Sequence, residues 1–90
     1  MNVCYKLIIF GKVQGVNFRN STYQKALELN LSGWVKNTPD GKVQVHVEGD
    51  AYMVNQFIEW CKSGPPSAEV LKVELELLQM ENYTDFTILR

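Results

Sequence analysis

The chain has 90 residues, of which 46% are hydrophobic and 21% charged, and its formal net charge is −1. This length predicts one domain over residues 1–90, able to bury roughly 60–65% of the surface that the unfolded chain exposes. The mixed charges disfavour a nucleic-acid-binding surface. No stretch approaches the roughly 18 apolar residues of a membrane span, and no secretory signal pattern is present. We therefore expect a cytoplasmic protein.

The first expected element is a strand that leads into a glycine-containing loop. Residues 3–10 (VCYKLIIF) are rich in β-forming residues, and the loop GKVQGVNFR (11–19) follows. This loop lacks the Gly-Lys-Ser/Thr ending of a P-loop and the glycine spacing of a dinucleotide fingerprint. Its free backbone N–H groups, the permissive Gly15 and the forked donor Arg19 nevertheless fit a phosphate. The alternative is a plain strand-to-helix connection with a solvated arginine.

A helix is expected next, from about Phe18 to Leu29. Side chains that can face a core recur at helical spacing: Phe18, Thr22, Ala26 and Leu29. A capping-box pattern at Ser21 and Gln24 would start the helix later. We favour the earlier start because the stripe already includes Phe18.

The middle of the chain predicts a β-hairpin. Residues 31–37 and 42–48 read as strands, and TPDG (38–41) between them has the residues that a tight turn prefers. Three valines alternate with three polar residues, so one face should meet the core and the other water: Val43, Val45 and Val47 against Gln44, His46 and Glu48. We therefore expect His46 on the wet face and do not assign it as a catalytic base.

The last part of the chain predicts a helix and two strands. Asp50 can cap the helix, and SGPP (63–66) should end it. Its apolar stripe comprises Met53, Val54, Phe57, Ile58 and Cys61. Residues 70–78 alternate leucine or valine with charged residues, as in a half-exposed strand, and residues 86–89 form a short final strand. The order β-α-β-β-α-β with an extra terminal strand predicts a ferredoxin-like α+β fold, with two helices on one face of a mainly antiparallel sheet.

The usual catalytic and metal-binding sets are missing. His46 is the only histidine, so neither a catalytic triad nor a zinc site is expected. Glu74 and Glu76 alternate along a strand and fit a solvated face. Cys4 and Cys61 read as small buried residues, and a disulfide between them would require Cα atoms within about 7 Å.

The sequence resembles the acylphosphatase family along nearly its whole length. The residues that carry this resemblance are GKVQGVNFR (11–19), GWVKNTPDG (33–41), VHVEGD (45–50), SGPPSAEV (63–70) and YTDFTILR (83–90). The polar NST (20–22) departs from the bulkier residues that relatives often carry there. The resemblance implies hydrolysis of small acyl phosphates to a carboxylate and inorganic phosphate, without a metal or cofactor.

The resemblance also implies the site residues. Arg19 matches the phosphate-binding arginine of the family, and Asn37 matches its water-orienting asparagine. The phosphate cradle corresponds to the backbone amides of Gln14, Gly15, Val16, Asn17 and Phe18 together with Arg19. Thr38 either holds the Asn37 loop in place or only stabilises the turn. The alternative to an enzyme is a non-catalytic phosphate-binding or interaction module on the same fold, and a monomer is expected in either case.

This assignment explains why general acids and metals are missing. The leaving group of an acyl phosphate is a carboxylate, which departs without protonation. A loose phosphoryl-transfer transition state mainly needs in-line positioning and stabilised equatorial oxygens. A ring of amides and one guanidinium can supply that stabilisation. Asn37 can orient water but cannot accept its proton, so we expect the proton to go to the substrate phosphate.

Overall fold

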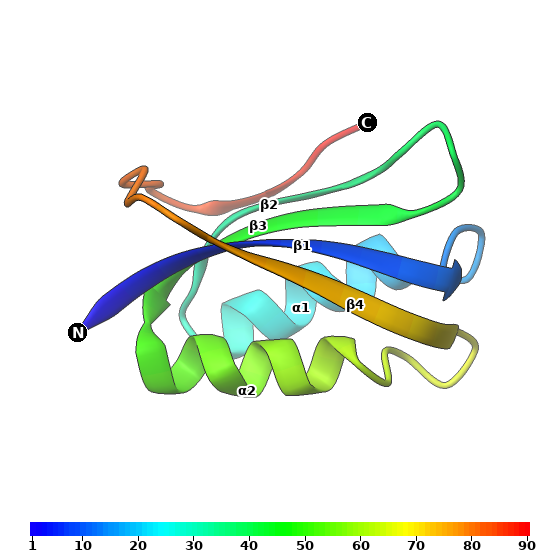
Figure 1. The fold of residues 1–90 in the computed structure, drawn as a ribbon, viewed down its shortest axis with the longest axis horizontal. Coiled ribbons are helices and arrows are strands. Elements are labelled where there is room, and N and C mark those ends of the chain that lie inside the picture. The colour runs from blue at the N-terminus through cyan, green and yellow to red at the C-terminus, as the bar shows by residue number, and fades with distance from the viewer.

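The computed structural model describes residues 1–90 and contains one five-stranded sheet with two helices on the same face (Figure 1). The strands lie in the order β4-β1-β3-β2-β5, and all neighbours are antiparallel except β2 and β5, which are parallel. The elements are β1 (Asn2–Lys12), α1 (Phe18–Glu28), β2 (Ser32–Asn37), β3 (Val43–Asp50), α2 (Ala51–Cys61), β4 (Glu69–Leu78) and β5 (Phe86–Ile88). The predicted ferredoxin-like fold with an extra strand is confirmed.

The core lies between the helices and the sheet, and the sequence periodicities predict most of it. The three valines of β3 are fully buried, as their alternation requires. Helix α1 begins at Phe18, so the earlier of the two starts is correct, and its predicted stripe is buried. Helix α2 buries Val54, Phe57, Ile58 and Cys61, whereas Met53 is only partly buried at the edge of the core.

The segment after α2 packs closely against the start of α1. Gly64 has φ 68°, and a Cβ at this position would lie 2.5 Å from Cε2 of Phe18. The ring of Trp60, near the end of α2, also contacts Phe18, with the two ring centroids 5.8 Å apart. The glycine is therefore required both by its backbone conformation and by space. This contact lets α2 support the first turn of α1.

Two predictions about the sheet need correction. The first concerns β4, which was expected to bury its face of leucine and valine. Three of these leucines, Leu71, Leu75 and Leu77, are 74%, 48% and 65% exposed, because β4 is an edge strand and α2 packs against β3 and β1 instead.

The second concerns Glu48, which was expected to face water. It faces away from the helices as predicted, but it is only 4% exposed, because the connection from β4 to β5 covers it. Its carboxylate accepts backbone N–H bonds from residues 81, 82 and 83 at 2.7, 3.0 and 2.8 Å.

The two cysteines are buried and free. Cys4 pairs with Glu48 across β1 and β3 and shares its face of the sheet, whereas Cys61 belongs to the core on the helix side. The sheet therefore separates the two thiols, which explains why no disulfide forms. Burial raises the pKa of both thiols.

Candidate active site

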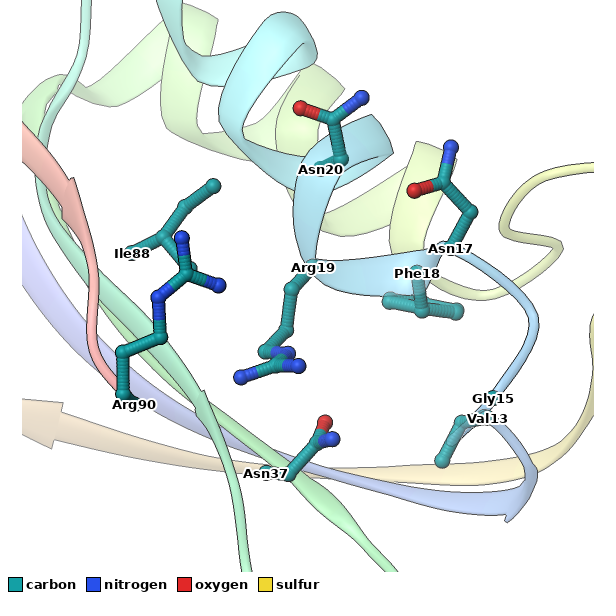
Figure 2. A pocket seen from close by; sticks show the side chains of 9 residues that line it. All are labelled: Val13, Gly15, Asn17, Phe18, Arg19, Asn20, Asn37, Ile88 and Arg90. Atoms are coloured by element: carbon teal, nitrogen blue, oxygen red, sulfur yellow. The ribbon is translucent and has the colours of Figure 1, made fainter.

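One cavity of about 350 Å³ lies where the loop after β1, the first turn of α1, the end of β2 and the last residues of the chain meet (Figure 2). Its lining combines two arginines, three asparagines and an apolar wall, and none of the lining side chains is a carboxylate, an imidazole or a thiol. The lining residues are Val13, Gly15, Asn17, Phe18, Arg19, Asn20, Asn37, Ile88 and Arg90. With two guanidinium groups and no acidic side chain, the cavity favours an anion.

The loop before α1 leaves its backbone donors unpaired. Gly15 has φ 74° and Asn17 has φ 64°, so the chain turns through left-handed conformations on its way into the helix. Asn17 is the N-cap residue, but its side chain makes no capping hydrogen bond. The N–H groups of residues 14–18 donate no hydrogen bond within the turns, loops and caps of the chain. Free N–H groups at a helix N-terminus form an anion-binding site.

Arg19 lies on the first turn of α1 and extends into the cavity toward Asn37 (Figure 2). Its Nη1 donates to the carbonyl oxygen of Leu89 at 3.3 Å. That bond holds one edge of the guanidinium against the chain that follows β5. The remaining N–H groups can therefore bind two oxygens of one phosphate in parallel.

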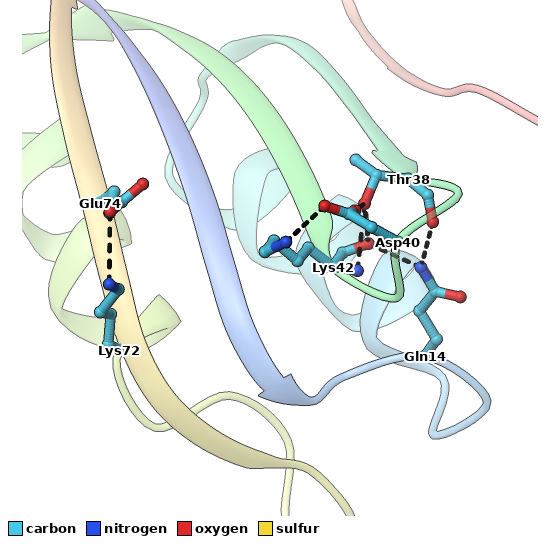
Figure 3. A network of polar contacts seen from close by, with 6 residues as sticks. All are labelled: Gln14, Thr38, Asp40, Lys42, Lys72 and Glu74. Carbon is cyan, nitrogen blue, oxygen red and sulfur yellow. Dashed lines mark hydrogen bonds and ion pairs between the residues drawn. The ribbon is translucent and has the colours of Figure 1, made fainter.

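Asn37 is the last residue of β2, and its side chain points into the cavity (Figure 2). The hairpin turn beside it is fixed by side chains (Figure 3). The hydroxyl of Thr38 donates to the carboxylate of Asp40 and accepts from the N–H of Lys42 at 3.0 Å. The hydrogen bond from Lys42, followed by that from Thr38, lowers the pKa of Asp40 to about 2. The contacts of the Thr38 hydroxyl thus lie within the turn.

Gln14 connects the loop to this hairpin. Its Nε2 donates to the carbonyl oxygens of Thr38 and Lys42 at 2.8 and 2.7 Å (Figure 3). The side chain therefore turns away from the cavity and fixes the distance between the loop and the strand that carries Asn37. Because the sequence suggested only a backbone contribution from Gln14, this side-chain contact was missed.

The cavity gathers most, but not all, of the residues that the sequence singled out. Gly15, Asn17, Phe18, Arg19 and Asn37 line it. Val16 does not, since it packs against the core and its carbonyl accepts the Ser67 hydroxyl at 2.9 Å. His46 lies elsewhere, stacked on Trp34 with ring centroids 4.2 Å apart. Burial, followed by the charge of Lys6, lowers the pKa of His46.

Four lining residues were not predicted: Val13, Asn20, Ile88 and Arg90. Ile88 and Arg90 reach the cavity because β5 pairs with β2 in parallel, with Ile88 opposite Val35. This pairing joins segments that are far apart in sequence, so no local pattern could have indicated it. Asn20 belongs to the NST segment (20–22), which the sequence resemblance singled out as a departure from the residues expected of the family.

Comparisons with known proteins agree with this geometry. A sequence model of the acylphosphatase family matches residues 5–88. The chain is 49% identical over 88 residues to an acylphosphatase of Acaryochloris marina, covering 98% of this chain and 95% of that one. The structure of an acylphosphatase from Coxiella burnetii superposes with a TM-score of 0.93 at 41% identity, covering 97% of this chain and 92% of that one.

A crystal structure of acylphosphatase from Bacillus subtilis superposes with a TM-score of 0.95 at 34% identity, covering 98% of this chain and 99% of that one. The likeness thus extends over nearly the whole chain. No helix of the structure has the length and apolarity needed to cross a membrane. By sequence and by structure alike, the chain belongs to the acylphosphatase family, a family of hydrolases.

Proposed function

We propose that the chain hydrolyses acyl phosphates in this cavity, with the phosphate bound by the N–H groups of residues 14–18 and by Arg19, and the attacking water oriented by Asn37. The observation that supports the proposal best is the set of unpaired N–H groups before α1, on a cavity that Arg19 and Asn37 also line. A tetrahedral anion is the group that such donors accommodate.

The donors contribute most in the transition state. As the phosphoryl group separates from the acyl oxygen, charge spreads over its three equatorial oxygens. Backbone amides and a guanidinium that are already in place stabilise this charge without reorganising. Their rigidity comes from the left-handed residues of the loop and from the Gln14 side chain.

Asn37 acts on the other reactant. Its amide holds a water in line with the acyl leaving group, on the side of phosphorus away from that group. The water oxygen forms a bond to phosphorus, the bond between phosphorus and the acyl oxygen breaks, and the carboxylate leaves with the electron pair. One proton of the water passes to a phosphate oxygen and the other stays on the attacking oxygen, so the products are a carboxylate and dihydrogen phosphate. No side chain needs to ionise in this sequence.

The proposal also covers cofactors, assembly and location. The cavity lining offers no carboxylate, imidazole or thiol side chain to a metal, and the proposed reaction uses these residues alone. Residues 1–90 work as one domain and as a monomer, without nucleic acid or membrane partners. Two free, buried cysteines suit a reducing compartment such as the cytoplasm.

An assay of benzoyl phosphate hydrolysis in the presence of EDTA tests this function. Turnover should be unchanged by the chelator, and inorganic phosphate should inhibit it competitively. Amide NMR shifts on adding phosphate should concentrate in residues 14–19. Phosphate binding without turnover would indicate the non-catalytic module instead, and loss of activity on chelation that magnesium restores would refute the mechanism.

A further inference from the structure

The cavity contains a second guanidinium that the proposed reaction does not use. Arg90 lines the cavity together with Arg19, and Figure 2 shows it reaching in from the side of Ile88, across from Gly15. Neither arginine takes part in any of the ion pairs of the structure. A chain with a net charge of −1 thus places two guanidinium groups that form no ion pair in one small cavity.

The backbone beside Arg90 is held in place. The N–H of Leu89 donates to the carbonyl oxygen of Val35 at 2.8 Å, which continues the pairing of β5 with β2. The carbonyl oxygen of Leu89 accepts from Arg19. These two bonds tie the residue before Arg90 both to the strand that carries Asn37 and to the phosphate-binding arginine. The structure therefore determines the side of the cavity from which Arg90 enters.

The position of Arg90 in the cavity indicates that Arg19 and Arg90 contact different parts of the substrate. The unpaired N–H groups of residues 14–18 lie on the Gly15 side of the cavity, and Arg19 projects between that side and Arg90 (Figure 2). A phosphate held by the loop and Arg19 is thus bound at one end of the cavity. Arg90 lies at the other end, beside the apolar side chain of Ile88. The acyl part of the substrate must occupy this end.

We propose that Arg90 binds a carboxylate on the acyl group, so that this chain prefers acyl phosphates whose acyl part carries a second negative charge. The inference rests on the proposed function, because it assigns the acyl end of the same cavity. Ile88 packs against the carbon skeleton between the two charged ends. Arg90 is a specificity-determining residue in this scheme and takes no part in the chemical step.

Three substituted benzoyl phosphates test the inference. In para-carboxybenzoyl phosphate and its meta isomer the second carboxylate is rigid and cannot attack the acyl carbon, and para-methylbenzoyl phosphate is the neutral counterpart. The wild-type chain should show a kcat/KM about tenfold higher for the better of the two charged substrates, the order expected of one charge-assisted hydrogen bond. Arg90→Met should remove this preference and leave turnover of the neutral substrate nearly unchanged.

Two further variants serve as controls. Lys72→Met removes a positive charge from β4, at the opposite edge of the sheet from β5, and should keep the full preference. Arg90→Lys should keep part of it, because a point charge replaces a forked donor. An equal loss on charged and neutral substrates in Arg90→Met would make Arg90 a phosphate ligand and overturn the inference. So would the absence of any preference in the wild-type chain, or its loss in Lys72→Met.

Phosphonates that cannot be hydrolysed separate this inference from the proposed function. Binding of para-carboxybenzyl phosphonate and of para-methylbenzyl phosphonate can be compared by calorimetry in the wild type and in Arg90→Met. A preference for the charged phosphonate that depends on Arg90, without turnover of any benzoyl phosphate, would support the binding site and refute the hydrolase. Turnover of benzoyl phosphate without that preference would support the hydrolase and refute the carboxylate-binding role of Arg90.

Discussion

The two helices have the same length and lie on the same face of the sheet, but they begin in opposite ways. Helix α2 has its own anion, since the carboxylate of Asp50 accepts the N–H groups of Tyr52 and Met53 at 3.1 and 3.4 Å. Helix α1 follows the left-handed N-cap residue Asn17, and no side chain caps it. Its first N–H groups stay unpaired beside Arg19.

This difference separates a structural helix start from a functional one. An internal cap stabilises a helix by about 1 kcal/mol, but it occupies the donors that a ligand would need. Helix α1 lacks that contribution and is held by packing instead, through buried Phe18 and the Trp60 ring of α2. Changes at the start of α1 should therefore affect ligand binding and turnover, and a change at the start of α2 should affect stability alone.

The largest effect is expected from removing the cation beside the free helix start. Arg19→Ala should weaken phosphate binding and cost about 3–4 kcal/mol of transition-state stabilisation, the range for a preorganised donor. Arg19→Lys should recover little, because it cannot form two parallel bonds to one phosphate. The measurements are kcat/KM for benzoyl phosphate and the rise of Tm that phosphate causes in each variant.

Circular dichroism of the Arg19 variants should match that of the wild type, since the side chain is only partly buried at an open cavity. Lys72→Met, which removes a distant charge, should keep both turnover and the phosphate effect on Tm. If Arg19→Ala lost no more activity than Lys72→Met, Arg19 would have no special role.

The second-largest effect tests whether Asn37 acts on the attacking water and not on phosphate binding. Asn37→Ala should lower kcat about 100-fold, or about 2.7 kcal/mol, the lower end of the range for one positioned donor. Phosphate should still raise the Tm of this variant as it does for the wild type, because Asn37 is assigned to the water. Loss of phosphate binding in a folded Asn37→Ala protein, or near-full turnover, would remove the water-orienting role.

The sequence predicted those parts of the site that depend on local chain geometry. Gly15 and Arg19 lie within one short loop and the helix turn that follows it, and Asn37 directly precedes a turn with a strong signature. The conformation of each segment could thus be inferred from its own residues. The roles of Arg19 and Asn37 came from family resemblance and stay predictions until the variants are measured.

The parts that were missed depend on contacts between distant segments. Arg90 joins the cavity only through the parallel pairing of β5 with β2, and Gln14 reaches a hairpin 24 and 28 residues away. The burial of Glu48 likewise depends on the path of the connection between β4 and β5. Alternation along a strand predicts which residues share a face, but it does not predict whether another segment covers that face.

The third prediction concerns the glycine of the uncapped loop. A Cβ at Gly15 would meet no atom within 4 Å, so the cost of Gly15→Ala comes from its φ of 74° alone. Left-handed backbone costs a residue with a side chain about 1–2 kcal/mol. Part of that strain should be relieved by movement of the loop, which would disperse the N–H groups and weaken phosphate inhibition as well as lowering Tm.

Gly41 provides the matched control for this change. It has φ 89° in the hairpin turn, and a Cβ there would also meet nothing within 4 Å. Gly41→Ala should lower Tm by a similar amount and leave phosphate inhibition as in the wild type. If phosphate inhibited the turnover of both variants equally well, the conformation of the loop at Gly15 would have no special importance for binding the anion.

The smallest effect is expected at the capped helix. Asp50→Ala removes the two hydrogen bonds at the start of α2 and should cost about 1 kcal/mol of stability, which lowers the Tm of a domain of this size by about 4–8 °C. Asp50→Asn keeps an accepting oxygen and should lose much less. Both variants should turn over benzoyl phosphate like the wild type at temperatures well below their Tm, and phosphate should raise their Tm by the usual amount, since Asp50 is not among the residues that line the cavity. A fall in kcat for Asp50→Ala under those conditions would mean that the start of α2 also serves the site, through the contact of Trp60 with Phe18, and the division between a structural and a functional helix start would fail.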